Sequence, residues 1–224
     1  MIGAASYRAA LVALAAVLCA APAAAQNPGR VEVGGGARWM GSTSFGAIPA
    51  DETLFGGGAR QLFESSTGLD QSIGGEARVA VRLTSLLEVE GAVVLTHVDL
   101  TTHVTGDVEG VADTSASEPV TQYTFEGGAL LQLVRRASGR LAPFVTGGAA
   151  YLRQLHDKRA LLDTGHAFYL GGGVKYLLTS GGTGRVKATG LRGEVRAVFT
   201  ATGIAPDDDL RTAPAVSGSF FVRF

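Results

Sequence analysis

The chain has 224 residues, and 46% of them are hydrophobic, which is enough apolar material for one folded domain or at most two. Its 19 basic and 20 acidic residues nearly balance, so no polybasic face points to a nucleic acid partner. A single cysteine excludes a scaffold stapled by disulfides.

The first 25 residues predict a secretory signal peptide. Arg8 is followed by an apolar run over 9–20 and then by the small-residue stretch APAAAQ, which is the usual order of such a signal. No later apolar run approaches the ~18 residues that a transmembrane helix needs. Acylation of Cys19 in a lipoprotein is the rival interpretation, but Leu18 stands where such sites carry a small residue. We therefore expect an exported domain over 26–224.

From residue 30 onward, the apolar residues recur with a period of two in segments of about ten residues, which is typical of β-strands. In IGGEARVAVRL, for example, Ala77 and Val79 share one face, and Glu76 and Arg78 share the other. Two segments, 142–152 and 167–178, are apolar on both faces, so their facing is left open. The eight predicted strands are 31–39, 73–83, 87–95, 122–133, 142–152, 167–178, 190–199 and 213–224.

The pattern fits two kinds of all-β protein. A soluble sandwich or lipocalin-like barrel would turn its apolar face inward, whereas a transmembrane barrel turns it toward lipid. Aromatic residues favour the transmembrane barrel, because they gather near the strand ends as interfacial belts do. The belt residues on the long-loop side are Trp39, Tyr123, Phe125, Tyr151, Phe168 and Phe199, and those on the other side are Tyr176 and Phe224.

Charged residues of both signs occupy central positions on the polar face of the strands. The interior of an eight-stranded barrel is just wide enough for side chains to fill, and charges buried there must be paired. We therefore predict a charge network in the lumen. Its members are Glu76, Arg78, Arg82, Glu88, Glu90, Glu126, Arg192, Glu194 and Arg196.

The last strand, SGSFFVRF, ends on an aromatic residue. Phe220, Val222 and Phe224 alternate on the face predicted to meet lipid, while Arg223 lies on the lumen face with Ser217 and Ser219. Phe221 breaks this alternation by placing a ring on the lumen face. We expect this strand to close against 31–39, because closure removes the sheet edge that lipid would not tolerate.

The signal peptide, the eight alternating strands, the segments PFVTGGAAY and YLGGGVKY, and the aromatic C-terminal strand together resemble the small outer-membrane β-barrel family of Gram-negative bacteria, the OmpA/OmpX-type barrels. The resemblance implies an eight-stranded antiparallel up-and-down transmembrane β-barrel in the bacterial outer membrane, in contact with outer-membrane lipid. It also implies that Phe220, Val222 and Phe224 form a signal for the barrel assembly machinery. It does not imply one activity, because the family includes anchors, adhesins and a few lipid-modifying enzymes.

Motifs for catalysis are scarce, so we expect neither an enzyme nor a cofactor. GxSxG, Walker, HExxH and CxxC patterns do not occur. His97, Asp99 and His103 would suit a metal ion if their loop folded back, and the aspartates at 207–209 would attract a divalent cation, but solvated loops are the simpler interpretation. A lipid-modifying enzyme would need a nucleophile or base, for which His166 and Ser219 are available.

These observations predict a structural or surface-interaction role, with a lumen too narrow for a general pore. The long segment 40–72 contains Leu54, Phe55, Leu62 and Phe63, which a merely solvated loop would not need. We expect this segment to pack over the barrel mouth or to contact a partner; whether it is ordered is left open. The alternatives are a soluble periplasmic or secreted β-barrel that binds a small apolar ligand and, less favoured, the lipid-modifying enzyme.

Overall fold

The computed structural model describes residues 29–53, 59–106, 112–134, 140–156, 162–181, 184–200 and 210–224. The predicted signal peptide, Leu54 and Phe55 of the first long segment, and the aspartates at 207–209 lie outside the described residues, so the expectations for them stay predictions. In the described ranges, no helix is both long enough and apolar enough to cross a membrane.

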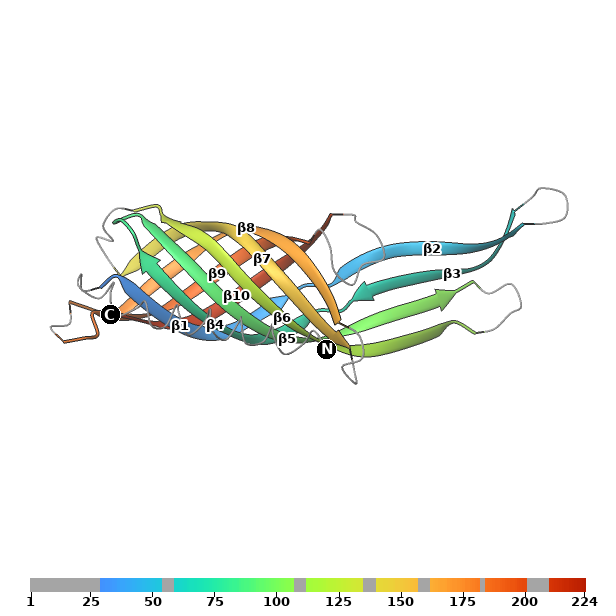
Figure 1. The fold of residues 1–224 in the computed structure, drawn as a ribbon, viewed down its shortest axis with the longest axis horizontal. Coiled ribbons are helices and arrows are strands. Elements are labelled where there is room, and N and C mark those ends of the chain that lie inside the picture. The colour runs from blue at the N-terminus through green and yellow to red at the C-terminus, as the bar shows by residue number, and fades with distance from the viewer. Residues whose placement is uncertain are drawn as a thin grey trace, which may run out of the picture.

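The described residues form strands that pair in one antiparallel sheet (Figure 1). Two of these strands, β2 and β3, lie inside the segment that was expected to be a loop, and β5, β6 and β8 are longer than predicted. The strands are β1 (Val31–Met40), β2 (Thr43–Thr53), β3 (Ala59–Leu69), β4 (Ser72–Arg82), β5 (Leu87–Thr105), β6 (Thr114–Gln132), β7 (Leu141–His156), β8 (Leu162–Ser180), β9 (Ala188–Thr200) and β10 (Arg211–Arg223).

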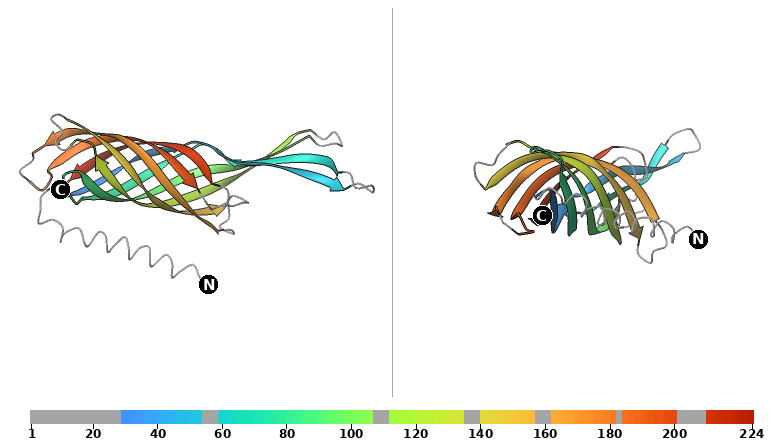
Figure 2. Two further views of the ribbon diagram at one scale, coloured as in Figure 1. Left: turned by 90° about the horizontal axis from the view of Figure 1, so that it is seen from above. Right: turned by 60° about the vertical axis from the view of Figure 1, so that its left-hand side comes forward.

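Eight of the strands close into a barrel in the order β1-β4-β5-β6-β7-β8-β9-β10. The seam between β1 and β10 runs from Glu32 opposite Arg223 to Met40 opposite Ala215. Beyond it, the Phe224 N–H donates to the Val31 carbonyl at 2.8 Å. Figure 2 shows the strands tilted around the barrel, with the C-terminus at the end that carries the short turns. The predicted eight-stranded transmembrane barrel is therefore confirmed.

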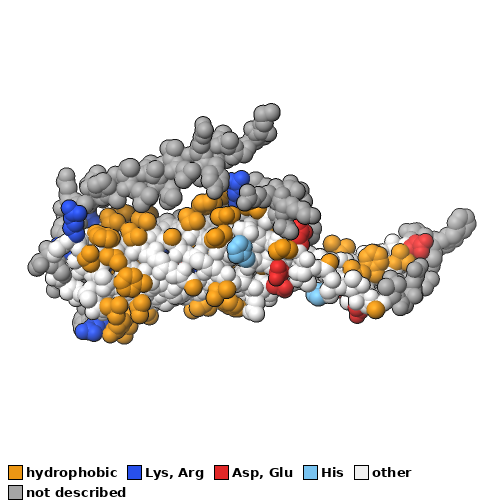
Figure 3. Space-filling model, turned by 90° about the horizontal axis from the view of Figure 1, so that it is seen from below, with side chains coloured by type: hydrophobic (Ala, Val, Ile, Leu, Met, Phe, Trp, Pro, Cys, Tyr) orange, Lys and Arg blue, Asp and Glu red, His pale blue; other side chains and the backbone are white. Residues whose placement is uncertain are grey.

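The wall of the barrel turns apolar side chains outward and polar side chains inward. In β9, Leu191 and Val195 are exposed on the outside, while Arg192 and Glu194 are buried inside. Figure 3 shows hydrophobic side chains gathered in patches on the visible outer surface of the barrel. The alternative of a soluble barrel with an apolar ligand cavity is wrong, because that protein needs the opposite facing.

Beyond the barrel, four strands form a protruding sheet, which we call the platform. It consists of β2, β3 and the outer parts of β5 and β6, residues 99–105 and 114–119. β6 pairs with β7 only from Val120 to Gln132, but it pairs with β5 outward as far as Thr114. β3 pairs with β5 from Glu64 to Leu69, and β2 pairs with β3. The platform points away from the barrel (Figures 1 and 2). The expectation that segment 40–72 packs over the mouth is therefore wrong, because β3 pairs with β5 and β2 pairs with β3.

The base of the platform is held to the barrel rim by Arg211 at the start of β10. Its guanidinium donates to the main-chain oxygens of Ser44 at 3.0 Å and Phe45 at 3.1 Å. The same group lies 5.2 Å from the centre of the Phe45 ring, which is buried. This contact fixes where β2 leaves the rim.

Candidate functional site

The inner wall brings the nine predicted lumen residues together with four others in two groups of ion pairs. The central group lies midway along the barrel and is contributed by β1, β4, β5, β6 and β9. It has four arginines and four glutamates, so its formal charges cancel. Its members are Arg38, Arg78, Arg192, Arg196, Glu76, Glu90, Glu126 and Glu194.

Each member of the central group contacts at least two partners. Arg38 donates to Glu76 at 2.5 Å and also pairs with Glu126. Arg196 donates to the same Glu126 at 2.6 Å and pairs with Glu194. All of these side chains are at most 5% exposed. Charges buried this deeply are tolerated only when they are paired, which the arrangement achieves.

A second group lies at the short-turn end of the lumen. Lys175 of β8 donates to Glu32 at 2.7 Å and to Glu88 at 2.6 Å. Arg223 donates to Glu32 at 2.7 Å, and Arg82 donates to Glu88 at 3.0 Å. The Arg82 side chain is 27% exposed, so this group borders solvent. The structure thus separates Arg82 and Glu88 from the other seven predicted residues.

Sequence reasoning did not assign four members of the two groups: Glu32, Arg38, Lys175 and Arg223. Three of them lie on the polar faces of the first and last predicted strands, so the alternation itself was sufficient to find them. Lys175 lies in YLGGGVKYLL, where apolar residues occupy both faces. Its signal is that glycines at 171 and 173 share its face and leave room in the lumen.

Three aromatic side chains also lie inside, each between glycine backbone and a cation. Tyr169 has its hydroxyl 2.6 Å from where a Cβ on Gly148 would stand, and the Arg196 guanidinium lies 4.4 Å from its ring centre. Phe144 and Phe221 are arranged in the same way.

The groups that contact the rings of Phe144 and Phe221 lie at similar distances. A Cβ on Gly173 would stand 2.8 Å from the Phe144 ring, which lies 4.5 Å from Arg192. Phe221 is 2% exposed, and Lys175 lies 5.5 Å from its ring centre. The ring that breaks the terminal alternation therefore fills the lumen at the short-turn end.

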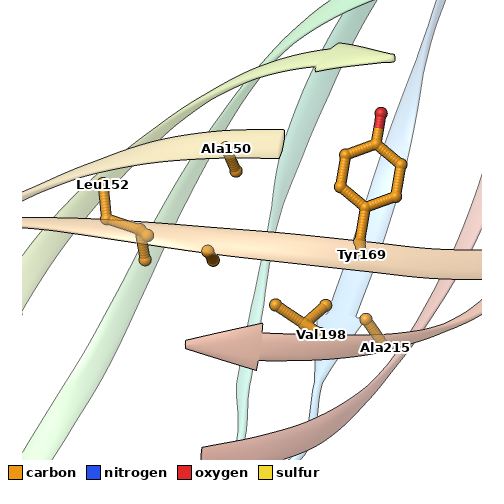
Figure 4. Packing of buried hydrophobic residues seen from close by; sticks show 6 residues of the cluster. Ala150, Leu152, Tyr169, Val198 and Ala215 are labelled. Atoms are coloured by element: carbon orange, nitrogen blue, oxygen red, sulfur yellow. The ribbon is translucent and has the colours of Figure 1, made fainter. Parts of the chain in front are cut away.

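The long-loop half of the lumen is lined by neutral side chains. A hydrophobic cluster packs against the inner wall there (Figure 4), and Thr96, Gln122 and Gln154 are buried near it. The cluster consists of Ala150, Leu152, Ala167, Tyr169, Val198 and Ala215. Side chains thus fill both halves of the lumen, and the groups can hold the wall together but leave little space for a solute.

The residues considered for catalysis do not meet. His166 is exposed on the outer face of β8, whereas Ser219 lies on the inner face of β10, beside Ser217 and Phe221. The barrel wall therefore separates them, and they cannot act as a nucleophile and its base.

The residues considered for metal binding lie on β5 rather than in a loop. His97, Asp99 and His103 are exposed on the outer face of that strand. The His97 ring nitrogen Nδ1 lies 3.1 Å from the Thr121 hydroxyl, and that of His103 lies 2.7 Å from the Ser115 hydroxyl. Among the described residues, no group of three or more His, Cys, Asp or Glu side chains is arranged to hold a metal ion.

A closed eight-stranded barrel with an apolar outer wall and a lumen full of paired charges defines an outer-membrane β-barrel protein. The family model for the outer membrane protein beta-barrel domain matches residues 10–224, so the chain belongs to this family, and its location is the bacterial outer membrane.

Solved structures share the fold. The outer membrane protein OprG from Pseudomonas aeruginosa is 11% identical, with a TM-score of 0.53 over 90% of this chain and 98% of that one. Neisserial surface protein A is 12% identical, with a TM-score of 0.52 over 87% of this chain and 97% of that one. Comparison with curated proteins finds no significant match. At these identities the likeness concerns the fold alone.

Proposed function

We propose that the protein is a filled outer-membrane barrel whose role is to hold the platform at the cell surface as a contact surface. The observation that carries this proposal is the continuity of β5 and β6 from the barrel wall into the platform. Their register runs without a shift from Leu87 opposite Leu131 to Val104 opposite Thr114. The role is structural or interactive, and transport through the lumen is not part of it.

The filled lumen supports this assignment. Transport would need a continuous polar path along the lumen. Instead, the second group of ion pairs, the central group of ion pairs and the hydrophobic cluster follow one another along the inner wall. In addition, small outer-membrane barrels place their long connections outside the cell and their short turns in the periplasm. The platform would then face the surroundings of the cell.

Labelling of single cysteines tests the orientation, because the chain has no cysteine after Cys19. We expect a membrane-impermeant maleimide to label Ser117→Cys on the platform of intact cells and to leave Ser180→Cys at the short-turn end unlabelled. Both variants should react after lysis, which controls for the reactivity of each site. Labelling of Ser180→Cys alone in intact cells would contradict the proposal.

Conductance tests the filled lumen. The purified protein in planar bilayers should show no steady conductance of the general-pore kind. A porin inserted under the same conditions serves as the positive control. A steady ohmic current from this protein would overturn the assignment of a non-transporting role.

A further inference from the structure

We propose that the free edge of β6 on the platform binds an extended, positively charged polypeptide segment, which joins the sheet as one more strand. This inference rests on the proposed function, because the edge must face the outside. Three features of the platform support it: the main-chain groups at this edge, the contrast with the other platform edge, and the charge of the platform.

Residues 114–118 of β6 have one strand neighbour among the described residues, which is β5. All five side chains are exposed. The Asp70 N–H donates to the Asp99 carbonyl at 2.9 Å, so the main-chain groups of Asp99 point away from β6. Asp99 stands opposite Pro119, and its orientation therefore fixes which β6 residues point outward.

Successive residues of a strand direct their main-chain groups to opposite sides. Because Pro119 points away from β5, Ser117 and Ser115 do so too, and their N–H and C=O groups are directed to the open edge. Proline has no main-chain N–H, but at position 119 this group would point away from β5, so the pairing of β5 with β6 loses no hydrogen bond. The edge therefore offers donors and acceptors over five residues, about 17 Å at the usual rise of a strand.

The opposite edge of the platform, β2, is built differently. It contains Pro49, and its pairing with β3 shifts register between Ser44 and Ala47 and again beyond Ala50. Bulges, prolines and edge charges are the devices by which proteins prevent strand addition. β6 has an unbroken register at 114–118, and its proline, Pro119, stands after this stretch rather than inside it. Residues 114–118 are therefore the part of the platform edge that accepts a strand.

The charge of the platform selects the partner. The described residues in and next to the platform, 43–53, 59–70, 99–106 and 112–118, include seven acidic residues and a single basic one, Arg60. Figure 3 shows acidic side chains on the platform and at its base. Such a surface attracts cations and repels anions. The seven are Asp51, Glu52, Glu64, Asp70, Asp99, Asp113 and Glu118.

The edge and the charge together describe one occupant. Main-chain pairing recognises an extended backbone with little dependence on sequence, and the acidic surroundings require Lys or Arg side chains along it. Asp113 and Glu118 flank the open edge at its two ends and are exposed. The partner is thus a basic segment of about five residues in a strand conformation.

Peptide binding to the full-length protein in zwitterionic detergent tests the proposal. The probes are an octapeptide of alternating Lys and Thr, and an octapeptide of alternating Lys and Pro that has the same charge but cannot form a paired strand. Fluorescence anisotropy should show binding of the Lys-Thr peptide that weakens as salt is added. The Lys-Pro peptide should bind at least about tenfold more weakly, because the edge hydrogen bonds are lost.

Variants of the edge separate its two contributions. Ser117→Pro removes an outward donor and should weaken binding about tenfold, whereas Ser117→Ala should leave it unchanged, because the hydroxyl is not used. The pair Asp113→Asn and Glu118→Gln should weaken binding and reduce its salt dependence. A heat-modifiable gel shift in every variant verifies that the barrel is folded.

Two results would overturn the proposal: equal binding of the Lys-Thr and Lys-Pro peptides, or binding of neither. Equal binding would mean that charge acts without strand addition. Neither result would affect the cysteine-labelling experiment, so this inference can fail while the surface orientation of the platform holds.

Discussion

Glycine makes room for aromatic rings on the inner face of this barrel. Tyr169 lies over Gly128 and Gly148, which stand on the two neighbouring inward positions of β6 and β7. Gly127, one residue before Gly128, points outward and has no atom within 4 Å of the place of its Cβ. Two adjacent glycines therefore have different physical roles, which makes them a matched pair for mutation.

Gly128→Ala should lower the free energy of unfolding by about 1–3 kcal/mol, because the added methyl group overlaps the Tyr169 hydroxyl and the main chain of Gly147. Gly127→Ala should change it by less than about 0.5 kcal/mol. Denaturant unfolding monitored by the single tryptophan, Trp39, measures both. Adding Tyr169→Phe to Gly128→Ala should restore part of the loss; equal effects of the two alanines would contradict the packing.

Arg38→Met should lower the free energy of unfolding by about 3 kcal/mol, because Glu76 and Glu126 each lose a buried partner. Arg82→Met is the control: it breaks one ion pair at a partly exposed position and should cost about 1 kcal/mol or less. The same unfolding measurement applies. Similar losses for both variants would show that burial does not set the strength of these pairs.

At the scale of elements, β10 has two separable properties: it closes the barrel, and it ends in the pattern proposed as an assembly signal. The closing hydrogen bonds at its end are main-chain bonds, from the Phe224 N–H to Val31 and from the Gly29 N–H to the Phe224 carbonyl. The side chain of Phe224, by contrast, is 44% exposed. Its ring is therefore free to serve recognition.

Phe224→Ala should reduce the amount of folded barrel in the outer membrane of cells and leave refolding of the purified protein into detergent unchanged, because the main-chain bonds remain. The heat-modifiable gel shift reports the folded fraction in both settings. Val222→Ala provides a comparison within the same pattern. A matching loss in cells and in detergent would indicate a purely structural role for the ring.

The regular alternation of the barrel strands made the fold predictable from sequence. Where the alternation is interrupted, the strands of the platform were not predicted. Residues 114–119 have no apolar face, and residues 99–105 keep only Leu100 and Val104 on theirs, so the alternation weakens where neither face meets lipid. β2 contains Gly46 and Pro49, which read as turn residues. What holds it is pairing with β3 and, through β3, with β5, a contact that no local pattern encodes.

At the scale of the whole molecule, the barrel and the platform have different surroundings: lipid surrounds the barrel, and water surrounds the platform. Val195 in β9 and Ile48 in β2 test this division, because they are 60% and 61% exposed. Exposure alone therefore does not distinguish them. Only the surroundings do.

Val195→Arg should lower the free energy of unfolding from lipid vesicles by about 2–4 kcal/mol, because the charge must enter the hydrocarbon region. Ile48→Arg should change it by less than about 0.5 kcal/mol. Unfolding in vesicles monitored through Trp39 measures both. If Val195→Arg left the free energy of unfolding unchanged, that part of β9 would lie outside the bilayer.

The uninterrupted course of β5 and β6 also has a mechanical consequence. A pull on the platform acts along two backbones that belong to the barrel wall, so both strands carry the tension into that wall. A loop of the same length would stretch first and transmit little force. A load attached at the edge of β6 is therefore borne directly by the membrane-embedded wall.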